Sequence, residues 1–133
     1  MDPVDVTLQR TDAGSPLCVT VTDERFEPAG AIVAVEGELD IVTAPILRER
    51  LNRLASDGVQ RLVIDLSAVP FMDSVAVAVL VSTKHQLGEG ARIVVVIDDA
   101  SYTRMIFEVA GLPNWLELVQ TREAAVARVQ ATA

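Results

Sequence analysis

Short apolar segments alternate along this chain with longer segments that carry helix-capping residues, and this alternation constrains the fold more than any other feature. Parallel strands need long crossover connections, which are usually helices. The alternation therefore predicts an α/β fold, with a small mixed β-sheet of four to five strands and flanking α-helices. Strands are expected at residues 17–22, 31–36, 61–66, 92–97 and 115–119, and helices at 44–56 and 75–87 and after Ser101 and Thr121.

The first helix is the most clearly marked element. Thr43 is a favourable N-cap residue, and Pro45 falls in the first turn, where its missing N–H costs no hydrogen bond. Leucines recur inside the segment at helical spacing, at positions 47, 51 and 54. These residues predict an amphipathic helix with one face in the core.

Residues 75–81 are ambiguous between strand and helix. Their alternation of valine and alanine resembles a strand, and β-branched residues favour one. A helix is favoured because Asp73 and Ser74 can cap its start, the segment continues to Leu87, and Gly88 can end it. A helix that is apolar on nearly every side is expected to be buried.

The length of 133 residues fits a single domain, 1–133, in which residues 1–16 are expected to be a loosely ordered lead-in that could include a short edge strand. The longest apolar run, 75–81, is far short of the ~20 residues that a membrane-spanning helix needs. The acidic N-terminus offers no basic region of a secretion signal, and Cys18 is the single cysteine. We therefore expect a cytoplasmic protein.

The formal net charge of −8 restricts the partners of the chain. The phosphate backbone of a nucleic acid and an anionic membrane surface would both repel it, so we expect it to bind neither directly. The remaining classes are a protein that acts on small molecules and a protein that binds another protein.

Few residues are available for catalysis or for a cofactor. The single histidine, His85, falls on the polar tail of the second predicted helix, and the chain has neither a Cys/His cluster for a metal nor a phosphate-binding loop. Acidic residues follow several strands, as they do in a phosphoacceptor receiver domain. Such a domain also needs an acidic pair after its first strand and a lysine after its last, and both are missing here. We therefore expect no enzyme, cofactor or metal.

The segment 71–74, Phe-Met-Asp-Ser, lies between a predicted strand and a predicted helix. A serine at a helix start often does no more than satisfy a free backbone N–H, which would explain Ser74 alone. Two further features indicate more: an acidic residue precedes the serine, and the turn at 37–40 would lie beside it if the strands at 31–36 and 61–66 are neighbours. A helix N-terminus also accommodates a phosphate group electrostatically.

Several motifs follow one another in a specific order and spacing: Gly37-Glu38-Leu39-Asp40, Thr43-Ala44-Pro45, Leu62-Val63-Ile64-Asp65-Leu66-Ser67, Val69-Pro70-Phe71-Met72-Asp73-Ser74 and Gly111-Leu112. In this order they resemble the opening, the central strand and the regulatory loop of the STAS family of anti-sigma factor antagonists. The resemblance covers roughly residues 17–130 and implies a STAS-like fold.

What the resemblance implies is a partner switch. Members of this family bind an anti-sigma factor serine kinase of the GHKL ATPase type and free the sigma factor. The kinase phosphorylates the serine after the loop aspartate, here Ser74, and a PP2C-type phosphatase reverses the modification. Asp40 and Asp73 match the family's kinase-contacting acids, and the same motifs would place further partner-binding residues at Glu38, Thr43 and Met72. We expect a monomer or a weak homodimer.

One departure keeps alternatives open. The family typically continues Asp-Ser-Ser-Gly, whereas this chain has Val75 and Ala76 after Ser74. The added Cβ of Ala76 would lie where a partner could approach the backbone. The chain could therefore be a soluble STAS scaffold or stress-signalling component that is not phosphorylated at Ser74. A nucleotide-binding regulatory protein is a second alternative.

Overall fold

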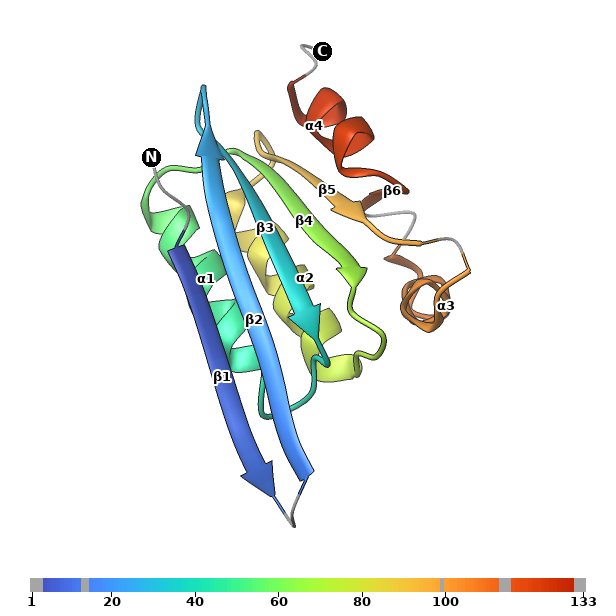
Figure 1. Ribbon diagram of the computed structural model, residues 1–133. Helices are drawn as coiled ribbons and strands as arrows, with labels where there is room; N and C mark the ends of the chain where they lie inside the picture. The colour runs from blue at the N-terminus through green and yellow to red at the C-terminus, as the bar shows by residue number, and fades with distance from the viewer. Residues whose placement is uncertain (1–3, 13–14, 99, 113–115, 131–133) are drawn as a thin grey trace.

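The computed structural model describes residues 4–12, 15–98, 100–112 and 116–130, with side chains described from residue 19 onward. Strands and helices alternate after an N-terminal hairpin, as the sequence predicts (Figure 1). The elements are β1 (Val4–Asp12), β2 (Ser15–Phe26), β3 (Gly30–Gly37), α1 (Ala44–Ser56), β4 (Arg61–Ala68), α2 (Ser74–Leu87), β5 (Arg92–Val96), α3 (Tyr102–Val109), β6 (Glu117–Val119) and α4 (Arg122–Gln130).

All six strands form one sheet in the order β1-β2-β3-β4-β5-β6. The pairs β1–β2 and β2–β3 are antiparallel, whereas β3, β4, β5 and β6 are parallel to one another. The helices between the parallel strands are the crossovers that such pairing requires. The expectation of a mixed-sheet α/β fold is confirmed.

The edge strand that the sequence suggested in the N-terminal segment is present, and it is longer than expected. Residues 4–12 form the edge strand β1, which pairs with β2 along its whole length, from Val4 opposite Asp23 to Asp12 opposite Ser15. The sheet therefore has six strands rather than four to five. The physical reason is that β2 begins at Ser15, earlier than predicted, and so offers a partner to the whole of β1.

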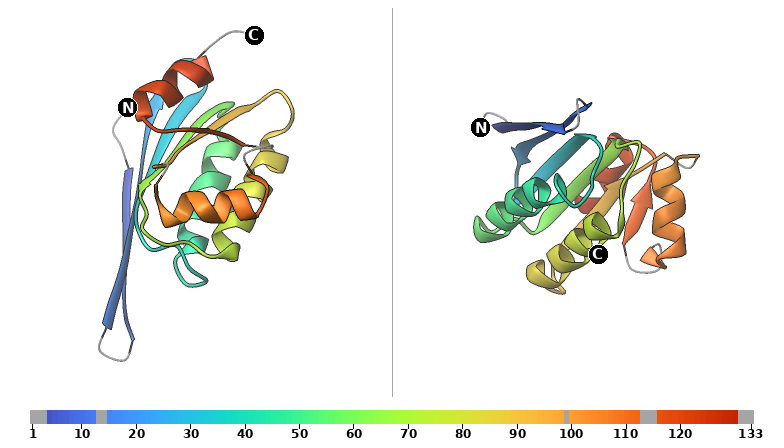
Figure 2. Two further views of the ribbon diagram at one scale, coloured as in Figure 1. Left: turned by 90° about the vertical axis from the view of Figure 1, so that its right-hand side faces the viewer. Right: turned by 90° about the horizontal axis from the view of Figure 1, so that it is seen from below.

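The helices cover the two faces of the sheet unequally (Figure 2). Helices α1 and α2 lie on one face, where the leucines of α1 pack in the main core with alternate residues of β3, β4 and β5, and Phe107 of α3 joins the same core. Helix α4 lies on the other face and packs in a smaller cluster with Val63, Val94 and Val96. The main core thus holds the carboxyl ends of β3 and β4, where the loops 38–43 and 69–73 begin.

Residues 75–81 are helical, which confirms the assignment made from the capping residues. Burial is less complete than expected, because Ala76, Val79 and Leu80 are buried while Ala78 faces solvent. Gly88 ends α2 with a φ of 87°, a conformation that glycine adopts without strain. Within the described ranges, no helix combines the length and the apolar composition needed to cross a membrane.

Candidate partner-binding site

Two loops meet at the carboxyl ends of β3 and β4. These strands are parallel neighbours, so the segments that follow them emerge at the same edge of the sheet. The backbone N–H of Leu39 donates to the carbonyl of Phe71 (3.0 Å), and the N–H of Asp73 donates to the carbonyl of Leu39 (3.1 Å). An isolated parallel bridge between Leu39 and Met72 results. The expected proximity of the two motifs is confirmed.

Asp73 caps the start of α2. Its carboxylate Oδ1 accepts hydrogen bonds from the backbone N–H of Val75 (3.0 Å) and, at longer distance, of Ala76 (3.4 Å). Ser74 is the first residue of the helix, and its side chain is exposed. Because the aspartate satisfies the free N–H groups, the serine hydroxyl is not needed for capping.

Asp40 organises the turn before α1. Its Oδ1 accepts hydrogen bonds from the backbone N–H groups of Val42 and Thr43, both at 2.9 Å. We expected Thr43 to cap this helix, but its side chain makes no capping hydrogen bond. Its hydroxyl instead donates to the carbonyl of Glu38 at 2.7 Å and accepts from the N–H of Asp40 at 2.9 Å. The turn is thus closed by side chains from both of its ends.

The predicted partner-binding residues divide into exposed and buried groups. Glu38 is exposed, and Asp40 and Asp73 are partly exposed. Met72 and Thr43, by contrast, are 0% and 1% exposed, because the first packs in the main core and the second bonds within its own turn. These two side chains are therefore not available to a partner in this structure, and they position the loops instead.

Ala76 also differs from our expectation. Its side chain is fully buried in the main core, so its Cβ lies against the domain itself and not where a partner would approach. Val75 is half-buried and packs against the same core. The departure from the family's Asp-Ser-Ser-Gly pattern therefore faces inward, while Ser74 beside it faces solvent.

We did not predict a role for α3 at this end of the molecule. The ring of Phe71 stacks on that of Tyr102, with 5.8 Å between ring centroids and 12° between planes. The buried hydroxyl of Thr103 donates to the carbonyl of Val69 at 2.9 Å. Both contacts attach α3 to the loop that carries Ser74. Tyr102 at the start of α3 was the available signal in the sequence.

A shallow hollow of about 300 Å³ lies on the opposite face of the sheet, lined by β2, β3, β4 and Arg122. At its edge the guanidinium of Arg122 donates two hydrogen bonds to Asp65 Oδ2, at 2.9 and 3.1 Å, and Ser67 donates to Oδ1. Burial alone would raise the pKa of Asp65, but the bonds from Ser67 and Arg122 hold it below its ordinary value of 3.8. The charges of Asp65 and Arg122 are paired with each other, and in the part of the chain that the structure describes no His/Cys/Asp/Glu group is placed to hold a metal ion.

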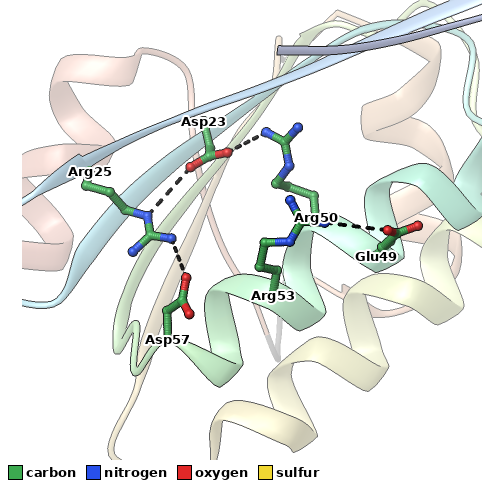
Figure 3. Close-up of polar contacts among 6 residues, drawn as sticks. All are labelled: Asp23, Arg25, Glu49, Arg50, Arg53 and Asp57. Carbon is green, nitrogen blue, oxygen red and sulfur yellow. Dashed lines mark hydrogen bonds and ion pairs between the residues drawn. The ribbon is translucent and has the colours of Figure 1, made fainter. Parts of the chain in front are cut away.

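A second charged cluster joins β2 to the C-terminal half of α1 (Figure 3). The carboxylate of Asp23 lies between Arg25 and Arg50, and Arg25 also pairs with Asp57 at 2.7 Å. Asp23 and Arg50 are both buried. This cluster attaches the helix to the sheet, and its central pair, Asp23 and Arg50, exposes little that a partner could bind.

Known proteins resemble the chain over most of its length. The anti-sigma-F factor antagonist RsfB of Mycobacterium tuberculosis is 33% identical over 118 residues, which cover 89% of this chain and 93% of that protein. The anti-sigma-B factor antagonist of Staphylococcus aureus is 28% identical over 104 residues, covering 78% and 93%. The crystal structure of an anti-sigma factor antagonist from Mycobacterium paratuberculosis matches with a TM-score of 0.79 and 32% identity, and covers 92% of this chain and all of that one.

None of these three names describes an enzyme, in agreement with the expectation that the chain is a regulator. The STAS domain family itself matches residues 20–125, a range that includes both loops of the candidate site. Fold, motif order and relatives agree, and the chain belongs to the STAS domain family.

Proposed function

We propose that the protein is a cytoplasmic anti-sigma factor antagonist that is switched off by phosphorylation of Ser74. It binds an anti-sigma factor serine kinase of the GHKL ATPase type, which then releases its sigma factor, and a PP2C-type phosphatase restores the bound state. The observation that carries this proposal is the exposed Ser74 at the start of α2, directly after a capping aspartate whose backbone bonds to the neighbouring loop at Leu39. The names of the relatives support it.

The electrostatics of the site favour a switch that acts on the complex and not on the fold. A phosphate on Ser74 would add about −1.5 to −2 charges at the N-terminus of a helix, where the helix dipole stabilises a negative group. The phosphate would lie beside Asp73 and close to the loop 38–43, which contains Asp40. A partner surface that fits these carboxylates would then meet an additional, bulky anionic group. The complex is therefore destabilised while the domain stays folded.

The inward orientation of Ala76 supports this function over an unphosphorylated scaffold. Val75 and Ala76, which stand where the family has its second serine and glycine, pack on the core. They therefore do not obstruct the approach to the exposed Ser74 hydroxyl. A kinase that recognises the exposed side of this loop would meet Glu38, Asp40, Asp73 and Ser74.

The test is phosphate mapping. The protein is incubated with its purified anti-sigma factor and ATP, and the modified residue is identified by mass spectrometry. We expect phosphate on Ser74, a persistent complex for Ser74→Ala, and at least about tenfold weaker binding for Ser74→Glu. Ser82→Ala, which removes an exposed hydroxyl from the same helix, is the matched control and should behave as wild type. Phosphate on another residue, or none while the complex still turns over, would contradict the proposal.

A further inference from the structure

An exposed apolar strip runs along α3. Tyr102, Met105 and Val109 follow one another at helical spacing and are 48%, 47% and 81% exposed. The opposite side of this helix is satisfied within the domain, because Phe107 is buried in the main core and Thr103 bonds to the loop after β4. The fold therefore does not need apolar residues on the outward side of this helix. We call Tyr102, Met105 and Val109 the α3 strip.

The α3 strip is continuous with the loop 69–73, which leads to Ser74. Tyr102 stacks on Phe71, which is itself 38% exposed and lies three residues before Ser74. In the loop between β3 and α1, Ile41 is 70% exposed. These five side chains are the large hydrophobics that the described residues expose, and all belong to α3 or to the two loops that form the candidate site.

Charge and area indicate what covers this surface. A second copy of the chain would carry the same net charge of −8, which opposes self-association. The α3 strip and Phe71 together are four partly exposed side chains, which supply only a fraction of the ~800 Å² that each partner contributes to a stable interface. A stable interface on the α3 strip must therefore also include the neighbouring loops.

We propose that the α3 strip, together with Phe71, is an apolar anchor for the anti-sigma factor, and that it contributes affinity independently of the charged loops. This inference rests on the proposed function. Apolar contacts of this kind are insensitive to ionic strength, whereas the contribution of Asp40 and Asp73 is screened by salt. The partner would present a complementary apolar surface next to the one that receives the acidic loops.

The test uses neutral polar substitutions in the full chain. Met105→Gln and Val109→Gln remove apolar surface without adding charge, and glutamine is a good helix former. The matched control is Ala127→Gln on α4, an exposed helical position on the other face of the sheet. Affinity for the purified anti-sigma factor is measured by titration calorimetry at low and high salt. Circular dichroism and denaturant unfolding confirm that each variant is folded.

We expect the double variant Met105→Gln/Val109→Gln to bind at least about tenfold more weakly than wild type at both salt concentrations, with Ala127→Gln unchanged. Wild-type binding by the double variant would overturn the anchor and leave the proposed function intact. A wild-type chain that binds none of the purified anti-sigma factors of its organism would overturn both. A dimer in sedimentation that the double variant abolishes, with unchanged anti-sigma affinity, would assign the strip to self-association instead.

Discussion

The two ends of α1 use charged residues in opposite ways. Toward its C-terminal half, Asp23 and Arg50 are buried together and the carboxylates of this cluster are paired with arginines. Before its N-terminus, Asp40 accepts hydrogen bonds from backbone N–H groups and remains partly exposed. The first arrangement holds two elements together, whereas the second shapes a loop and still presents charge to solvent.

This difference separates residues that stabilise the domain from residues that a partner can contact. A buried carboxylate paired with arginine has little free surface, and losing its partner is costly. A capping carboxylate contributes less to stability and retains an exposed side. Three predictions test this division, and they follow in order of expected effect.

The largest effect is expected at Asp23. Asp23→Ala removes the carboxylate that faces the buried guanidinium of Arg50, and we expect the free energy of unfolding to fall by about 3–5 kcal/mol. Urea denaturation followed by circular dichroism measures it. Arg53→Ala, which breaks an exposed pair with Glu49 on the same helix, should cost less than about 1 kcal/mol. Equal losses in the two variants would mean that the buried pair of Asp23 with Arg50 stabilises the domain no more than an exposed pair does.

A smaller effect is expected at Asp73, where two substitutions separate capping from charge. Asp73→Ala should lower the free energy of unfolding by ~1 kcal/mol because α2 loses its cap, whereas Asp73→Asn should retain most of it. Both should weaken binding to the anti-sigma factor, by about 1–3 kcal/mol if the carboxylate is hydrogen-bonded in the complex. Asp40→Ala and Asp40→Asn should weaken binding in the same way, and the loss of stability in Asp40→Ala would come from the turn before α1.

Titration calorimetry gives the affinities for these four variants. If the asparagine variants bind as tightly as wild type, the charge of the two carboxylates contributes nothing to the complex. Their role would then be confined to shaping the loops.

The smallest effect is expected at Arg122, on the face of the sheet away from both regions. The lowered pKa of Asp65 means that its ionised form stabilises the fold above the ordinary value of 3.8, and that this contribution is lost as the pH falls through the folded-state pKa. Arg122→Gln should cost less than about 1 kcal/mol at neutral pH, since Arg122 is about half exposed. The difference from wild type should shrink in acid.

Denaturation curves across this pH range measure the difference. Arg48→Gln, at an exposed position on α1, removes the same charge and should show no such pH dependence. A deficit for Arg122→Gln that stays constant in acid would mean that the pair with Asp65 is not its cause.

Local chemistry was enough to predict much of this fold and part of the site. The caps at Asp73 and Gly88 identified α2 as a helix against the β-propensity of its valines. The partners of Thr43 and Asp40 could not be predicted. Thr43 is a good capping residue, but its hydroxyl bonds back to Glu38, and the Asp40 carboxylate closes the turn before α1.

Long-range placement accounts for the other differences. Pairing of β1 with β2 depends on where β2 begins, which the sequence signals weakly. Met72 and Phe71 are adjacent, yet one is buried and the other exposed, because the bridge to Leu39 sets which side of the loop faces the core. The apolar spacing in α3 would ordinarily indicate burial. Only the position of the helix beside the sheet shows that one side remains uncovered.

The bridge between Leu39 and Met72 also bears on the thermodynamics of partner exchange. Folding has already brought the two loops together, so complex formation leaves little backbone entropy to be lost there. Because the two loops are preorganised, association and release depend on the side chains that the loops expose and not on rearrangement of the backbone. Under the proposed function, repeated cycles of binding and release would then require no refolding of these two loops.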